Sequence, residues 1–203
     1  MATNATSDPL GLTKEEAAKV ERYDANPLDG IWIFIVGDMF IFGSYFVTYA
    51  LWRNWGHEEF LASQQFLSQG FGIFNTLVLL ASSWFVAAAI RAQRAGDYDI
   101  AARLTIMTMG WGLIFVASKI TEWLIKIGEG FTFTYDMFSQ FYFWMTGVHI
   151  LHVFFGMLAL GRLYIEVKDP ACRNNETAEA CAAFWHMVDL LWLVIFALMY
   201  LMR

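Results

Sequence analysis

The segment Phe184–Trp192, FWHMVDLLW, decides how this sequence folds. It lies in an apolar run, residues 180–202, which is long enough to cross a bilayer, because a spanning helix needs about 20 residues. His186 and Asp189 are three residues apart, so a helix places both side chains on one face. Ionisable side chains at membrane depth are costly and usually face a protein interior, where they find a partner. The segment therefore predicts a membrane helix that packs against other helices.

Four further apolar runs precede this one, near residues 31–52, 71–90, 101–127 and 139–163. The chain of 203 residues is 58% hydrophobic and 16% charged, whereas water-soluble domains average roughly 45–50% apolar and about 25% charged residues. These features predict an all-α integral membrane protein with five transmembrane helices. Residues 1–30 are polar and lack the apolar centre of a signal peptide. We therefore expect an N-terminal arm at 1–30 and a transmembrane domain at 31–203.

The cations predict the orientation of the five helices. Three basic residues lie on the side of the C-terminus. Nine lie on the side shared by the N-terminus and the loops after the second and fourth helices: Lys14, Lys19, Arg22, Arg91, Arg94, Arg103, Arg162, Lys168 and Arg173. The positive-inside rule then places the N-terminus in the cytoplasm and the C-terminus in the periplasm of a bacterial inner membrane. The net charge of −6 and the lack of a basic tract give no indication of a nucleic-acid partner.

Ionisable residues occur within several of the predicted helices, and the topology assigns each a depth. Asp38 of the first helix and the pair His186 and Asp189 of the fifth lie in the cytoplasmic half of the membrane. His149 and His152 of the fourth helix lie near its middle. We expect Asp38, His152, His186 and Asp189 to meet at one level of the bundle.

Lys119 and Glu122 are three residues apart in the outer half of the third helix, so we expect them to pair with each other. This pair is either a self-neutralised contact between helices or an interface ion pair toward a partner subunit. Aromatic residues near the ends of the runs, among them Trp55 and Tyr200, are expected to be interfacial anchors.

From the residues alone, three interpretations of the buried polar groups remain open. They form a hydrogen-bonded network that sets helix rotation, since each interhelical polar contact in a membrane contributes roughly 0.6–2 kcal/mol. Alternatively they form a proton or ion pathway, as in an ion-coupled carrier that uses Asp38 and Glu122. In the third interpretation the histidines and carboxylates bind a divalent metal ion, although a histidine pair at this spacing is not by itself a ligand signature.

Four stretches of the sequence, taken in order, resemble subunit III of the haem-copper oxidases. They are IFIVGDMFIF at 33–42, NTLVLLASS at 75–83, FYFWMTGVHILHVFFG at 141–156 and FWHMVDLLW at 184–192. On this resemblance the chain is similar to a short, five-helix member of the family that includes cytochrome c and quinol oxidase subunit 3. Two departures stand out: Asp38 replaces the usual glutamate, and Lys119 replaces the glutamine of a Gln-Ala-x-Glu-Tyr motif. The lysine looks most like the branch associated with nitric oxide reductase.

The resemblance implies two helix bundles, helices 1–2 and helices 3–5, around a lipid-binding cleft. It implies an accessory subunit without catalytic residues, haem or copper of its own, in a complex that carries out aerobic electron transport. Phospholipid would be bound here, whereas haem and copper or non-haem iron would lie in the catalytic subunit I, the expected partner along with other respiratory subunits. The accessory subunit of a nitric oxide reductase is the alternative. The family's buried polar positions are matched by Asp38, Glu122, His149, His152, His186 and Asp189.

Overall fold

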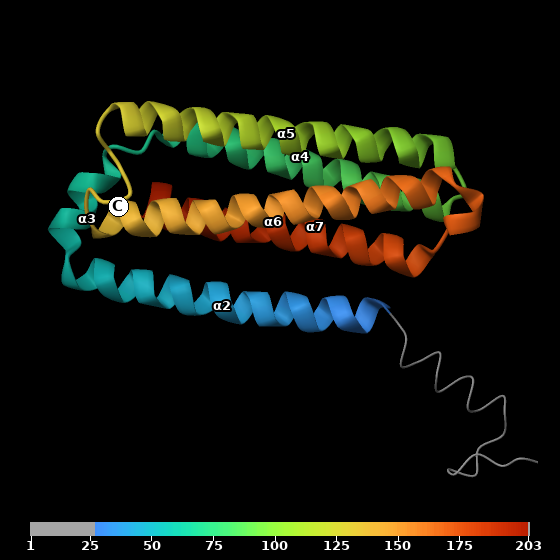
Figure 1. Ribbon diagram of the computed structural model, residues 1–203, viewed down its shortest axis with the longest axis horizontal. Coiled ribbons are helices and arrows are strands. Elements are labelled where there is room, and N and C mark those ends of the chain that lie inside the picture. The colour runs from blue at the N-terminus through green and yellow to red at the C-terminus, as the bar shows by residue number, and fades with distance from the viewer. Residues whose placement is uncertain (1–26, 203) are drawn as a thin grey trace, which may run out of the picture.

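The computed structural model describes residues 27–202, and every regular element among them is a helix (Figure 1). The predicted arm at 1–30 falls outside this range except for 27–30, which begin the first helix. In chain order the elements are α2 (Pro27–Trp55), α3 (His57–Gln64), α4 (Gln69–Arg94), α5 (Tyr98–Gly128), α6 (Met137–Lys168), the 3-10 turn η1 (Pro170–Cys172), α7 (Asn175–Phe196) and the π-helical turn η2 (Ala197–Leu201).

Five of these helices are long and apolar enough to cross a membrane, namely α2, α4, α5, α6 and α7 continued by η2. The predicted all-α class with five transmembrane helices is confirmed. The spans extend beyond the apolar runs at most of their ends, because a helix continues into polar sequence as long as its polar side chains reach water. At the start of α6, for example, Asp136 and Ser139 form a capping box that satisfies free backbone N–H groups.

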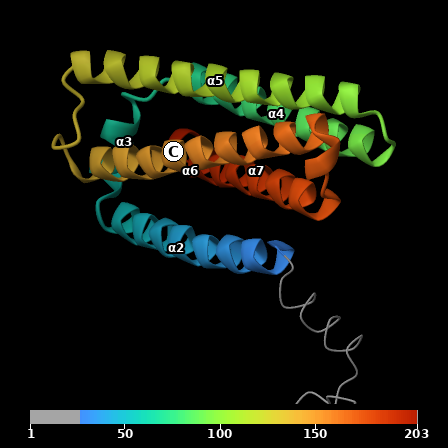
Figure 2. The same ribbon diagram turned by 45° about the vertical axis from the view of Figure 1, so that its right-hand side comes forward.

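The spanning helices form three layers (Figures 1 and 2). Helices α4 and α5 lie side by side in one outer layer, α6 and α7 form the middle layer, and α2 lies alone on the opposite side. In its most apolar window α7 is 61% buried, whereas α2 is only 17% buried. Helix α7 is therefore the core of the molecule, and it packs against both α2 and α4, the two helices predicted to form one bundle.

Close packing in the middle of the bundle depends on glycine. The indole of Trp185 in α7 is fully buried between Gly112 of α5 and Gly156 of α6. A Cβ atom on Gly156 would lie 2.7 Å from Cε3 of this indole, and one on Gly112 would lie 2.9 Å from Cη2. Small residues thus let three membrane helices approach closely around one large side chain.

A short helix, α3, lies between the first two spans, where the sequence predicted no helix. Helix α3 buries Phe60 and Gln64, one turn apart, while Glu58 and Glu59 are exposed. It packs against α6 and α2 at the end of the bundle where η2 also lies. At 8 residues its periodicity is too short to stand out from a loop in sequence.

Candidate functional site

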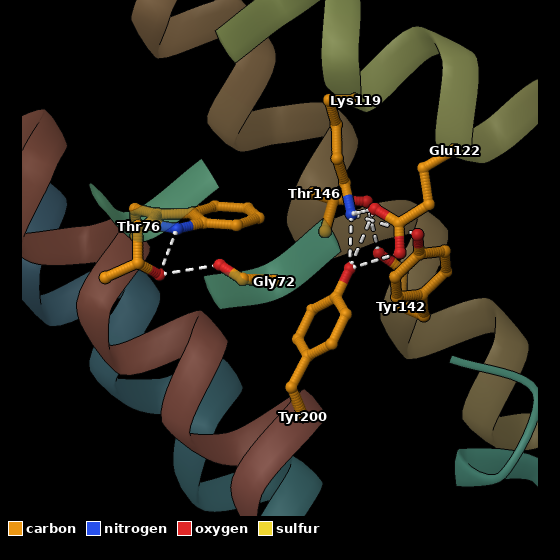
Figure 3. A network of polar contacts seen from close by, with 8 residues as sticks. Gly72, Thr76, Lys119, Glu122, Tyr142, Thr146 and Tyr200 are labelled. Atoms are coloured by element: carbon orange, nitrogen blue, oxygen red, sulfur yellow. Dashed lines mark hydrogen bonds and ion pairs between the residues drawn. The ribbon is translucent and has the colours of Figure 1, made fainter. Parts of the chain in front are cut away.

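The most enclosed polar cluster joins α5, α6 and the turn η2 (Figure 3). The Lys119 ammonium donates to Glu122 Oε2 at 2.8 Å, to Tyr142 Oη at 2.9 Å and to Tyr200 Oη at 2.7 Å. Tyr200 in turn donates to Glu122 Oε1 at 2.8 Å. An ammonium has three donor hydrogens, and all three are used here.

This arrangement completes an ion pair in the interior. Lys119 and Glu122 are both fully buried, so neither reaches the surface of the chain to meet a partner subunit. Burying two charges is tolerated when excellent geometry and further hydrogen bonds satisfy them, and the phenols of Tyr142 and Tyr200 supply these bonds. The ammonium also lies 5.3 Å from the ring centroid of Trp192. The cluster is therefore suited to holding helices together.

The turn η2 brings Tyr200 into this cluster, which the sequence did not predict. Tyr200 was expected to be an interfacial anchor, but only 1% of it is exposed. Tyr200 lies within the π-helical turn Ala197–Leu201 and faces inward toward Lys119. One signal was available: Tyr200 and Tyr142 both lie inside apolar runs that also contain ionisable residues.

The backbone carbonyls of this C-terminal segment are bound by side chains from the first half of the chain. A helix end leaves its last carbonyls without intrahelical partners. Four side-chain donors of α2, α3 and α4 meet them at 2.7–3.2 Å: Tyr49 to Leu198, Arg53 to Met202, Gln64 to Met199 and Gln69 to Tyr200. The end of the core helix is thereby attached to the rest of the bundle.

Asp38 of α2 and His152 of α6 form the second polar contact between helices. His152 Nε2 lies 3.0 Å from Asp38 Oδ1, and both residues are buried. His152 Nδ1 lies 2.8 Å from the carbonyl oxygen of Val148, one turn earlier in the same helix. The two contacts hold the imidazole in place, and the one with Asp38 links α2 to the bundle.

His186 does not join Asp38 and His152. Its Nδ1 lies 2.7 Å from the hydroxyl of Ser83, so it links α7 to α4. The residue before it, Trp185, donates from its indole N–H to Ser82 of the same helix at 3.1 Å. Trp185 and His186 of the FWHMVDLLW segment thus form hydrogen bonds with α4, the second spanning helix. Of the four residues that we expected to meet at one level, only Asp38 and His152 are hydrogen-bonded to each other.

Two of the predicted polar residues, His149 and Asp189, form no side-chain hydrogen bond with another described residue. This holds for both ring nitrogens of His149 and for both carboxyl oxygens of Asp189, and both residues are at least nine-tenths buried. His149 instead packs its ring against Phe115 and Trp192, with centroids 5.5 Å and 5.3 Å away. The three membrane histidines thus have separate surroundings. Within residues 27–202, no group of three or more His, Cys, Asp or Glu side chains is arranged to hold a metal ion.

A groove opens between α2 and α6. Its cavity of about 520 Å³ is lined by Ser44, Tyr45, Thr48, Phe133, Met137, Gln140, Phe141 and Trp144. A second cavity of about 150 Å³ shares Tyr45 and Trp144 with it and extends it along α2. The two shared rings are stacked with centroids 6.5 Å apart. The groove thus combines apolar walls with a few hydroxyl and amide groups.

Comparisons with known proteins agree with this architecture. The family model described as cytochrome c oxidase subunit III matches residues 26–203. Cytochrome c oxidase subunit 3 of Thermostichus vulcanus is 27% identical over 85% of this chain and 86% of its own length. Cytochrome bo(3) ubiquinol oxidase subunit 3 of Pseudomonas aeruginosa is 28% identical over 87% of this chain and 85% of its own length. A haem-copper oxidase subunit I+III of Aeropyrum pernix is 25% identical over 84% of this chain and 22% of its own length.

Proposed function

The chain belongs to the cytochrome c oxidase subunit III family, and from this membership we propose that it is the non-catalytic accessory subunit of a haem-copper terminal oxidase. The observation that carries the proposal is the family match over residues 26–203, which includes all five spanning helices. Relatives of similar length are named as subunit 3 of cytochrome c and of quinol oxidases. These names favour an oxygen-reducing partner over a nitric oxide reductase.

The partner is the catalytic subunit I of the same oxidase. In the Aeropyrum pernix relative the printed name joins subunits I and III in one chain, and our chain matches 22% of its length. Such a fusion keeps two domains together and supports a stable association between the corresponding separate subunits. Haem and copper would be held by that partner.

Within the complex we assign phospholipid to the groove between α2 and α6. Lipid chains fit a groove whose walls include Phe141 and Trp144, and a headgroup needs the hydrogen-bonding groups that Thr48 and Gln140 supply. The helix α2 borders this groove and is the least buried of the five spans. The Asp38–His152 bond then determines how closely α2 approaches α6.

The cations support a cytoplasmic N-terminus in a bacterial inner membrane. The cytoplasmic ends of the helices then include Arg94, which pairs with Glu179 at 2.7 Å, and Lys168, which lies 3.6 Å from Asp99. The end that contains α3 and η2 would face the periplasm. Cysteine labelling from either side of intact cells, at Glu58 and at Asp99, tests this orientation.

An ion-coupled carrier is the candidate from another class, and the contacts do not favour it. Glu122 is bonded to Lys119 and Tyr200 inside a complete cluster, and Asp38 is bonded to His152. A carrier residue must release its partner in each transport cycle, which would leave a buried charge unpaired. A buried network that holds helices in register accounts for the same residues without such a step.

Co-purification tests the proposed function. We expect an affinity-tagged chain, extracted from its native membrane in mild detergent, to bring down a haem-containing partner with oxygen-reducing activity. The chain produced alone and reconstituted in liposomes should move neither protons nor solutes. A haem-free chain that conducts protons by itself would contradict the proposal, and a partner that reduces only nitric oxide would assign the chain to the other branch.

A further inference from the structure

Two polar side chains in the centre of the bundle have no hydrogen-bond partner among residues 27–202. Asn75 of α4 and His149 of α6 are both fully buried. Neither the amide nitrogen and oxygen of Asn75 nor the two ring nitrogens of His149 form a hydrogen bond with another described residue. An amide and a neutral imidazole each carry both donors and acceptors. Such groups are rarely left unpaired in a protein interior, because their desolvation is then not offset.

Both residues border the region around Trp192 of α7, a cross-section of the bundle that we call the Trp192 layer. Thr76, which follows Asn75 in α4, accepts a hydrogen bond from the Trp192 indole at 3.1 Å. The ring of His149 lies 5.3 Å from the ring of Trp192. Asp189 precedes Trp192 by three residues in α7, and neither of its buried carboxyl oxygens forms a hydrogen bond with another described group. Side chains of α4, α6 and α7 that lack such bonds thus border the Trp192 layer.

We propose that water molecules are bound inside the bundle in this layer, held by Asn75 and His149 and extended toward Asp189. Buried waters typically form about three hydrogen bonds to polar groups that would otherwise be unsatisfied, and this layer offers both donors and acceptors. The proposal does not depend on the identity of the partner complex, since the groups that bind the water belong to this chain alone.

The ligand is neutral water rather than a cation. The Lys119 ammonium lies 5.3 Å from the Trp192 ring, in the same layer. Glu122 neutralises this charge at 2.8 Å, and within residues 27–202 no group of three or more His, Cys, Asp or Glu side chains is arranged to hold a metal ion. Water needs only hydrogen-bonding groups, and the amide of Asn75 and the imidazole of His149 supply both donors and acceptors. The site therefore stabilises the packing of α4, α6 and α7.

Hydroxyl-radical footprinting of the purified complex tests this proposal. X-ray radiolysis converts water to hydroxyl radicals, which label a buried side chain only where a bound water lies beside it. Trp192 and Trp185 provide a matched pair, because both are fully buried in α7. Trp185 is the control, because it donates to Ser82 and packs against two glycines. We expect mass spectrometry to show Trp192 labelled several-fold faster than Trp185, at a rate closer to that of the exposed Trp55.

A variant identifies the groups that hold the water. The double substitution Asn75→Leu with His149→Phe removes the polar atoms while retaining side-chain volume, and we expect Trp192 labelling to fall to the Trp185 level. If Trp192 is labelled no faster than Trp185 in the unmodified complex, the layer is dry and the proposal is overturned. This comparison requires no variant to fold. Unchanged Trp192 labelling in the double variant would overturn the assignment to Asn75 and His149.

Discussion

Asp38 and His152 are separated by 114 positions in the sequence, yet their side chains are 3.0 Å apart. Their hydrogen bond joins the least buried helix, α2, to the middle layer of the bundle. Helix α2 otherwise depends on packing against α7 and on the hydrogen bonds of Tyr49 and Arg53 near its C-terminal end. The Asp38–His152 bond is therefore the buried polar contact that holds the N-terminal half of α2 against the bundle.

Removal of this contact should loosen α2 without preventing assembly. We expect Asp38→Ala to lose roughly 0.6–2 kcal/mol, the size of an interhelical polar contact in a membrane. The complex should still form, but it should retain less phospholipid and lose activity faster during sustained turnover. Lipid content by mass spectrometry and oxygen consumption over time measure these effects. Asp38→Asn, which keeps an acceptor for His152, is the control and should lie close to the unmodified protein. Failure of Asp38→Ala to insert or assemble would show that the residue is needed for the fold itself.

The Lys119–Glu122 pair should be sensitive to the loss of one partner and tolerant of the loss of both. Lys119→Met leaves the Glu122 carboxylate in the interior without its cation, which costs about 3–5 kcal/mol for a buried pair. The double variant Lys119→Met with Glu122→Gln removes both charges and should recover most of this loss. Thermal inactivation of the purified complex provides the measurement. Equal stability of the single and double variants would refute the description of the cluster as a buried ion pair.

Two glycines of α6 should respond oppositely to the same substitution. Gly156→Ala places a Cβ atom 2.7 Å from the Trp185 indole, and such overpacking costs about 1–3 kcal/mol. Gly161→Ala meets no atom within 4 Å, so it should be neutral or slightly stabilising, because alanine favours helices over glycine. Resistance of the complex to heat in detergent compares the two. A tolerated Gly156→Ala would show that the indole is free to move aside.

Filling the groove should displace the lipid that we assign to it. Ser44 lines the cavity between α2 and α6, so Ser44→Trp should reduce the phospholipid retained after purification. Val47→Trp is the matched control, because Val47 lies on the same helix, is 61% exposed and does not line the groove. Native mass spectrometry of the two variants reads the difference directly. Retention of the same lipid by Ser44→Trp would exclude this groove as the binding site.

The helices could be predicted because a membrane restricts the choice of structure so strongly. Five apolar runs in a bilayer must satisfy their backbone groups internally, and helices do this within each segment. The pairing of Lys119 with Glu122 was also predictable, since residues three apart in a helix are neighbours whatever the tertiary structure. Helix α3 was missed because 8 residues near the membrane surface carry too short a pattern.

The partners of the buried polar residues were harder to predict. Depth in the membrane narrowed the candidates for Asp38 to residues of other helices, but it did not separate His152 from His186. That distinction depends on how each helix is rotated about its axis, and rotation is decided by packing. Trp185 lies between Gly112 and Gly156, and with the indole in that place the next residue, His186, turns toward Ser83 of α4.

The sequence by itself determined the class of the protein, its five spans and its family, because hydropathy and motif order are properties of the chain alone. Tertiary structure decided what the FWHMVDLLW segment does. In this helix Trp185 and Trp192 are the largest fully buried side chains, His186 links α7 to α4, and Asp189 forms no hydrogen bond with another residue that the structure describes. The physical reason is that the contacts of a buried side chain depend on which residues pack around it. Here those residues come from three other helices.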